Sequence, residues 1–179
     1  GGVNSWTGMC LDEERGIVYV PTGSAAFDFF GGYRTGENLF ANCLLALDAK
    51  TGERIWHYQL THHDLWDYDL PAPPTLVTIN KEGREVDAVA QITKQGLVFM
   101  FDRETGEPIF PIEERPVPQS KLPGESSWPT QPFPVKPPPF VRHVFDESQI
   151  TDISEESNQY IREFIKGANY GTIYTPPSL

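Results

Sequence analysis

The chain has 179 residues, of which 39% are hydrophobic and 22% charged, so a packed domain of ordinary size is expected. The formal net charge of −11 leaves no basic footprint, which argues against nucleic acid or an anionic membrane surface as a partner. The sequence shows no apolar run long enough for a membrane span and no signal-peptide pattern. Neither end resembles a natural terminus, so we expect an excised fragment.

Short apolar segments run through the first 110 residues and are separated by turns that contain Gly, Pro or Asp. The 17 prolines and 15 glycines argue against long helices over most of the chain. We therefore predict an all-β fold for residues 1–110. The predicted strands are 17–20, 44–47, 55–58, 76–79, 86–92 and 97–101.

One turn motif occurs twice in this region. Residues 48–53 (Asp-Ala-Lys-Thr-Gly-Glu) and 102–107 (Asp-Arg-Glu-Thr-Gly-Glu) match with their aspartates 54 positions apart, and Trp56 then corresponds to Phe110. A repeat of about this length, built from short strands, is typical of β-propeller blades, which bury their faces against neighbouring blades. The repeat predicts about two partial blades in residues 1–110, each a four-stranded antiparallel sheet. Trp56 and Phe110 would hold purely structural positions in them.

The composition changes after residue 110. Residues 111–145 contain ten prolines, which predicts an extended, irregular excursion. In residues 146–179, a helix-start composition is followed by apolar residues at helical spacing. We predict a short helix from about 154 to 167, ended by Gly167, and then an extended tail in the same domain.

Residues 62–69 concentrate ionisable and aromatic side chains: two histidines, three aspartates and two aromatics. His62, His63 and Asp64 suggest a zinc cluster and hence a metal hydrolase. However, adjacent side chains of an extended segment point to opposite faces and rarely share an ion. We favour hydrogen bonds from these residues that position the loop around Asp67.

Residues 46–59 follow the pattern Ala-Leu-Asp-x-x-Thr-Gly-x-x-x-Trp-x-x-Gln. This pattern resembles the tryptophan-docking motif of dehydrogenases that depend on pyrroloquinoline quinone (PQQ), the quinoproteins. The resemblance implies part of an eight-bladed β-propeller. It extends over nearly the whole chain and is greatest to the membrane-bound glucose dehydrogenase branch, which also has similar segments at 116–119 and 129–132.

Two residues match the positions at which this family places its catalytic groups. Residues 63–67 resemble the segment that supplies the catalytic aspartate, so Asp67 would be the general base that removes a hydroxyl proton. Lys94, 27 residues later, would stabilise the negative charge that develops on the quinone oxygens. Without the resemblance, Asp67 is read as a turn cap and Lys94 as an exposed turn lysine.

The resemblance also implies cofactor and metal contacts. Trp6 would stack on the quinone, although a core tryptophan is an equal alternative, and Thr22 and Trp66 would contribute further cofactor contacts. The metal would be calcium or magnesium, with a lanthanide as a possibility. Its candidate ligands are Ser24, Asp67 and Asp69, and the hydroxyl of Ser24 is the weakest donor among them.

The function implied is oxidation of a glucose-like sugar or an alcohol by hydride transfer to PQQ, with ubiquinone or cytochrome c as electron acceptor. The remaining propeller blades would complete the enzyme, in the periplasm or on a membrane anchor that faces it, and the fragment alone would be inactive. The main alternative is a non-catalytic propeller scaffold, which has no reason to keep Asp67 and Lys94 at this spacing.

Overall fold

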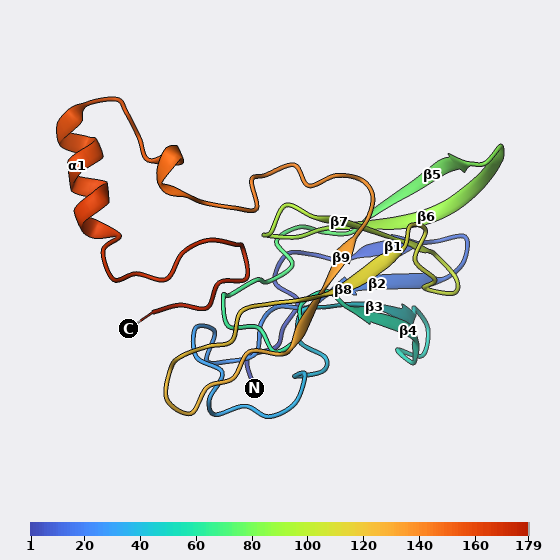
Figure 1. The fold of residues 1–179 in the computed structure, drawn as a ribbon. Helices are drawn as coiled ribbons and strands as arrows, with labels where there is room; N and C mark the ends of the chain where they lie inside the picture. The colour runs from blue at the N-terminus through green and yellow to red at the C-terminus, as the bar shows by residue number, and fades with distance from the viewer. Residues whose placement is uncertain (179) are drawn as a thin grey trace.

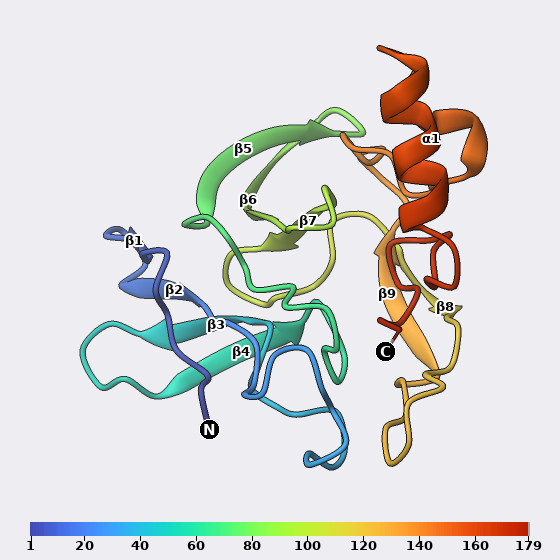
Figure 2. The same ribbon diagram turned by 90° about the vertical axis from the view of Figure 1, so that its left-hand side faces the viewer.

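The computed structural model describes residues 1–178 and consists of antiparallel sheets with a short helix near the C-terminus (Figures 1 and 2). The first sheet has four strands in chain order: β1 (Cys10–Asp12), β2 (Ile17–Pro21), β3 (Cys43–Asp48) and β4 (Arg54–Gln59). The second sheet has three: β5 (Thr75–Lys81), β6 (Arg84–Ile92) and β7 (Val98–Asp102). The predicted all-β character of residues 1–110 is confirmed.

The repeated turn motif forms the same turn after β3 and after β7. In the first copy, Oδ1 of Asp48 accepts the backbone N–H groups of the residues two and three positions later, at 2.9 and 2.8 Å. Asp102 does the same at 3.0 and 2.9 Å. Gly52 and Gly106 follow with φ of 74° and 72°, a conformation that glycine adopts without steric cost. The same side-chain hydrogen bonds and the same glycine conformation therefore form the turn in both copies of the motif.

The second sheet differs from the prediction because it has three strands instead of four. After β7, the chain pairs back only through an isolated bridge between Phe101 and Pro108 and a bond from the N–H of Ile109 to the carbonyl of Met100 at 2.8 Å. Pro108 and Pro111 have no N–H to donate, which limits the hydrogen bonds that this segment can form with β7. The four-stranded prediction is thus correct for the first sheet only.

Trp56 on β4 packs against the second sheet, at the turn that follows β7. Its indole Nε1 donates to the carbonyl of Arg103 at 3.0 Å, and the hydroxyl of Tyr19 donates to the same carbonyl at 2.9 Å. The Trp56 ring lies 5.8 Å from the rings of both Tyr19 and Phe101. The buried apolar core around it spans both sheets: Ile17, Tyr19, Leu44, Ala46, Trp56, Leu60, Leu70, Val89, Leu97, Phe99 and Phe101.

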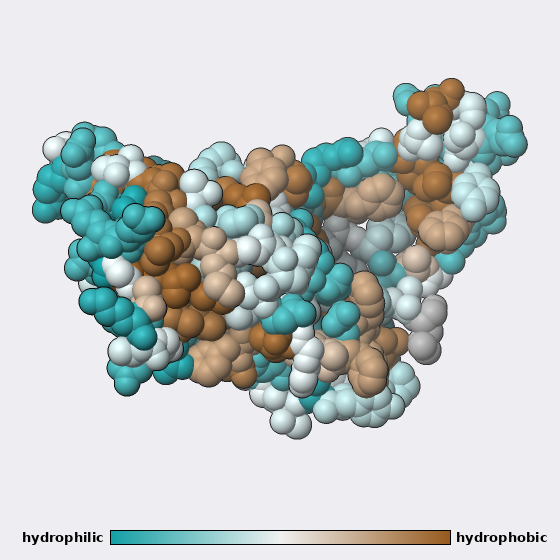
Figure 3. Space-filling model, turned by 180° about the vertical axis from the view of Figure 1, so that it is seen from behind, coloured by the Kyte–Doolittle hydropathy of each residue, from teal (hydrophilic) through white to brown (hydrophobic). Residues whose placement is uncertain are grey.

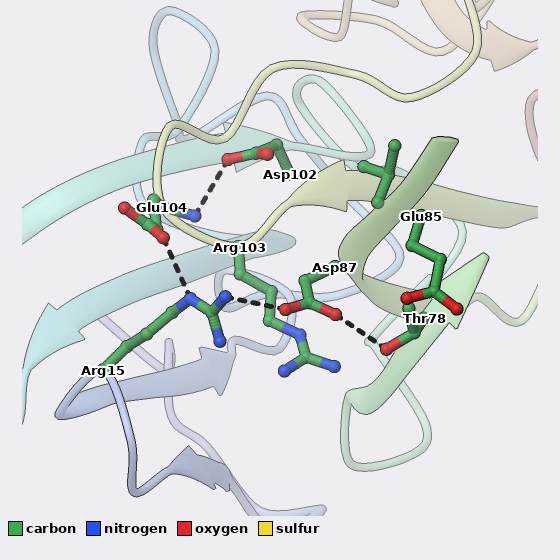
Figure 4. Close-up of a pocket in the computed structure, with 8 residues that line it drawn as sticks. Arg15, Thr78, Glu85, Asp87, Asp102, Arg103 and Glu104 are labelled. Carbon is green, nitrogen blue, oxygen red and sulfur yellow. Dashed lines mark hydrogen bonds and ion pairs between the residues drawn. The ribbon is translucent and has the colours of Figure 1, made fainter. Parts of the chain in front are cut away.

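Trp56 and the turn after β7 thus form a joint between the two sheets. Charged side chains reinforce this joint at a pocket of about 420 Å³ (Figure 4). The guanidinium of Arg15, from the β1–β2 turn, bonds Asp87 on β6 at 2.7 Å and Glu104 in the turn after β7 at 3.0 Å. Asp12, which is buried, pairs with Arg15 and with Arg103, each at 3.1 Å. The charges that line the pocket are therefore largely engaged in joining the two sheets.

The Pro-rich segment is more regular than predicted. It contains a two-stranded antiparallel sheet of β8 (Ile112–Pro116) and β9 (Thr130–Pro134), in which Glu114 lies opposite Pro132. Both strands are edge strands, and proline is tolerated there because its missing N–H need not face a partner. The prediction of an irregular excursion over 111–145 is therefore wrong for this hairpin.

Helix α1 (Glu155–Phe164) follows a 3₁₀ turn, Glu147–Gln149, and lies apart from the sheets (Figure 1). The hydroxyl of Ser154 caps it by accepting the N–H of Ser157 at 3.0 Å. The helix ends three residues earlier than predicted, because residues 165–167 form a turn that reaches Gly167 with φ of 83°. No helix in the described part of the chain combines the length and apolar character needed to cross a bilayer.

Large apolar side chains remain exposed both on the strand-rich part of the molecule and on the part that carries α1 (Figure 3). The most exposed include Phe27, Phe29, Tyr33, Ile153, Tyr160 and Phe164. Cys10 and Cys43 are both free thiols, and Cys43 is buried.

Candidate active site

Lys94 brings two aspartates of the β4–β5 connection together. Its ammonium Nζ, in the turn between β6 and β7, lies 3.0 Å from Oδ2 of Asp67 and 3.2 Å from Oδ2 of Asp69. Nζ also donates to the carbonyl of Asp67 at 2.7 Å. The side chains of Lys94 and Asp67 are each 30% exposed, so this cluster is accessible from solvent. Residues that are 27 apart in the sequence thus form one charged centre.

The three groups influence one another's ionisation. Burial raises the pKa of Asp67, and this outweighs the lowering by the hydrogen bond from Lys94. Burial also acts to raise the pKa of Asp69, but the N–H of Ser24 and the ammonium of Lys94 outweigh it and hold the pKa below its usual value. For Lys94, burial is outweighed by bonds to Asp67 and Asp69, so its pKa is raised. The cluster therefore combines a firmly protonated cation with one carboxylate of raised basicity.

Ser24, predicted as a weak metal ligand, lies at the edge of this cluster. Its N–H donates to Oδ1 of Asp69 at 2.5 Å, and its hydroxyl donates to the buried carboxylate of Asp64. The Ser24 hydroxyl is therefore already hydrogen-bonded within the protein. Asn42, which the sequence reasoning missed, donates to the Ser24 hydroxyl at 3.1 Å and to Asp64 at 3.0 Å.

Thr22 and Trp6 have different environments. The hydroxyl of Thr22 is buried, donates to the carbonyl of Phe40 at 2.7 Å and accepts the N–H of Cys43 at 2.8 Å, so its bonding capacity is used within the protein. Trp6 is 56% exposed and is therefore no core tryptophan within the described residues. Its segment approaches the site through Asn4, whose carbonyl accepts the N–H of Gly23 at 2.8 Å.

Trp66 belongs to an aromatic cluster that the C-terminal tail completes. Its indole Nε1 donates to the carbonyl of Thr175 at 2.9 Å, and its ring stacks on Tyr68 with 5.7 Å between centroids. Tyr174, fully buried, meets both rings edge-on. The structure thus uses Trp66 to anchor residues more than one hundred positions away beside the Asp67 loop.

The neighbouring histidines do not form a zinc cluster with Asp64. His62 bonds Gln59 at 2.7 Å and Glu114 at 3.0 Å, whereas Nδ1 of His63 bonds the carbonyl of Gly36 at 2.6 Å. Within residues 1–178, no group of three His, Cys, Asp or Glu side chains is arranged to hold a metal ion on its own. The geometry therefore gives no support to a metal hydrolase.

The comparison with known families decides the identity. All of residues 1–179 match the family described as "PQQ: Glucose/ethanol/alcohol dehydrogenase, beta-propeller domain". The chain belongs to this family. The relationship that the docking pattern and the Asp67–Lys94 spacing indicated is therefore confirmed, and the chain is a segment of a quinoprotein dehydrogenase propeller.

Individual quinoproteins agree with this assignment. The chain is 40% identical to quinoprotein glucose dehydrogenase A of Acinetobacter calcoaceticus over 98% of its own length and 23% of the relative's. It is 39% identical to the glycerol dehydrogenase large subunit of Gluconobacter thailandicus over 100% of the chain and 25% of the relative. The solved quinohemoprotein alcohol dehydrogenase of Comamonas testosteroni superimposes with a TM-score of 0.59 at 30% identity, covering 76% of this chain and 20% of that structure. The chain thus spans between a fifth and a quarter of these relatives' length.

Proposed function

We propose that this chain forms one wall of the active site of a PQQ-dependent dehydrogenase that oxidises a hydroxyl group of a glucose-like sugar or an alcohol. The observation that carries the proposal is the contact of Lys94 with both Asp67 and Asp69 at an accessible site. Relatives named for glucose and glycerol support a polyhydroxylated substrate. The proposed acceptor of the electrons beyond the quinone is ubiquinone or a cytochrome c, and the proposed location is the periplasm.

Asp67 is proposed as the general base. Oxidation of a hydroxyl requires that its proton leave as hydride departs from carbon, and a carboxylate oxygen of Asp67 would receive that proton. The raised pKa makes Asp67 a stronger base than an ordinary aspartate, while 30% exposure keeps the side chain within reach of a substrate. PQQ, when bound, supplies the acceptor for the two electrons.

Lys94 is proposed to provide a fixed positive charge. Its raised pKa keeps the ammonium protonated at neutral pH, and Asp67 and Asp69 hold it in place. A preorganised cation stabilises negative charge where it develops on a bound group. The exposed indole of Trp6 is available as a stacking surface for a planar cofactor.

The acidic pair also fits a hard metal ion in its donor chemistry. Oxygens of Asp67 and Asp69 already converge on one cation, the Lys94 ammonium, and carboxylate oxygens are the ligands that calcium and magnesium prefer. Because the described residues hold no sufficient set of ligands themselves, further oxygens would have to come from the cofactor or from other parts of the protein. The side chain of Ser24 is the least available candidate, since its oxygen already accepts a hydrogen bond from Nδ2 of Asn42 and its hydrogen is directed to Asp64.

The experiment uses the full-length enzyme reconstituted with PQQ and assayed by dye reduction with a sugar or alcohol donor. Asp67→Asn should retain quinone binding but lower turnover by roughly 10² to 10⁴, the range of general base catalysis. Lys94→Ala should lower both turnover and quinone affinity, whereas Lys50→Ala, which removes an exposed turn lysine, should change neither. Near wild-type turnover of quinone-loaded Asp67→Asn would refute the assignment of Asp67 as the base, whereas a wild-type protein without quinone-dependent turnover would favour the non-catalytic scaffold.

A further inference from the structure

Asp67 adopts a backbone conformation that residues with a side chain seldom occupy. Its φ is 60°, in the left-handed region, where the Cβ atom approaches the backbone closely. Such a conformation persists only where the surroundings hold it. The bonds from Lys94 reach Asp67 from a turn of the second sheet, so they do not explain what shapes the loop itself.

The two residues that flank Asp67 are both fixed by one buried carboxylate, that of Asp64. Oδ1 of Asp64 accepts the N–H of Trp66 at 2.9 Å, and Oδ2 accepts the N–H of Tyr68 at 2.6 Å. Asp64 is only 1% exposed. The peptide groups on either side of the proposed base are therefore tied to a single rigid point.

Two more donors complete the surroundings of Asp64. The Ser24 hydroxyl and Nδ2 of Asn42 both donate to Oδ2. All four partners of this carboxylate act as donors, so an amide in its place would turn an N–H₂ group toward another donor. A carboxylate is therefore the side chain that suits this position.

The same network reaches the other acid of the cluster. Asn42 donates to the carbonyl of Tyr68 at 2.9 Å, and the N–H of Ser24 donates to Asp69 at 2.5 Å. Both side chains that donate to the Asp64 carboxylate, those of Ser24 and Asn42, thus belong to residues that also bond the segment carrying the two partners of Lys94. The neighbouring histidines, which bond elsewhere, have no such connection.

We propose that Asp64 is a positioning residue that holds Asp67 in its left-handed conformation and so directs the carboxylate of Asp67 toward Lys94. The inference rests on the proposed function, because it assigns to Asp64 the placement of the proposed base. Asp64 itself, buried beneath the loop, does not contact substrate or cofactor. Its effect on catalysis passes through the backbone of Trp66 and Tyr68.

The test compares Asp64→Asn with Asp48→Asn in the full-length, quinone-loaded enzyme. Asp48 is a matched control, because it also accepts two backbone N–H groups of its own turn, at 2.9 and 2.8 Å, but lies in the β3–β4 turn. Hydrogen exchange followed by mass spectrometry should show faster exchange in the peptide that contains Trp66 and Tyr68 for Asp64→Asn alone. Turnover per bound quinone should fall by about 10- to 100-fold, as expected when a reacting group is misplaced, with little change in KM.

The outcomes separate this inference from the proposed function. Faster exchange with unchanged turnover in Asp64→Asn, while Asp67→Asn is inactive, would overturn the positioning role and leave the base assignment intact. Full activity of both variants would overturn both. If Asp64→Asn does not fold, Asn42→Ser gives the same comparison in weaker form, since it removes the donor that joins Asp64 to the carbonyl of Tyr68. Unchanged exchange and turnover in folded Asn42→Ser would likewise contradict the proposal.

Discussion

Two glycines in equivalent turns provide a sensitive test of the joint between the sheets. Gly52 and Gly106 occupy the same position of the repeated motif, with φ of 74° and 72°. A Cβ atom built on Gly52 meets nothing within 4 Å, whereas one built on Gly106 would lie 2.5 Å from Cδ2 and 2.7 Å from Cγ of Trp56. The two substitutions to alanine therefore differ only in the contact with Trp56.

The structure gives the expected magnitudes. Gly52→Ala should lower the free energy of unfolding by about 1–2 kcal/mol, the cost of a left-handed conformation for a residue with a Cβ atom. Gly106→Ala carries the same cost and also overpacks the Trp56 ring, which adds about 1–3 kcal/mol. The expected loss for Gly106→Ala is therefore roughly 2–5 kcal/mol.

Urea unfolding followed by circular dichroism measures both variants, and a double-mutant cycle with Trp56→Leu identifies the source of the difference. In the Trp56→Leu background, the additional cost of Gly106→Ala should shrink, because the smaller side chain leaves room for the new methyl group. The cost of Gly52→Ala should not change. If the two glycine variants agree within about 0.5 kcal/mol, the error of additivity, then Trp56 does not press on this turn as the structure shows.

Two further substitutions address the same joint. Trp56→Ala should cost about 3–5 kcal/mol in urea unfolding, as usual for a buried aromatic, whereas its half-exposed neighbour Ile55 should cost less than about 1 kcal/mol when changed to alanine; equal values would place Trp56 outside the core. Asp12→Asn should cost about 1.5–3 kcal/mol at neutral pH. Burial acts to raise the pKa of Asp12, but the N–H of Arg15 and the guanidinium groups of Arg103 and Arg15 outweigh it and hold the pKa below 3.8. The stabilisation is therefore full above that value and is lost as pH falls through the lower folded pKa, so acid unfolding curves of wild type and variant should converge there. Curves that stay equally separated at all pH values would contradict this assignment.

The sequence predicted those features that depend on neighbouring residues. The strands follow from short apolar segments between turn residues, and the two Asp-x-x-Thr-Gly-Glu turns from an aspartate that accepts the next N–H groups. The start of helix α1 followed in the same way from the helix-start composition of residues 154–158, in which the structure shows Ser154 as the cap. The β8–β9 hairpin was missed because its pairing joins residues such as Glu114 and Pro132 across a long loop. The high proline content also favoured an irregular segment over strands.

The candidate site could not be assembled from the residues alone. Asp67 and Lys94 are ordinary turn residues until the resemblance to quinoproteins and their spacing single them out. Asn42 gave no signal that sequence reasoning used, although an asparagine just before a strand, here with φ of 51°, is a position where left-handed backbone is tolerated. The ion pair of Arg15 with Asp87 likewise joins residues 72 positions apart, and only the packing of the two sheets brings them together.

Strands β4 and β7 both extend from the joint at Trp56 toward the cluster at Lys94. Trp56 lies near the start of β4 and contacts the turn after β7, while the end of β4 leads to Asp67 and the start of β7 follows Lys94. Between these ends, Tyr58 and Phe101 pack with 4.9 Å between ring centroids. Because close-packed interiors transmit displacement, a shift of the sheets at Trp56 would also move Lys94 relative to Asp67. We therefore expect the contact of Trp56 with the turn after β7 to influence the distance between Asp67 and Lys94 as well as the stability of the fold.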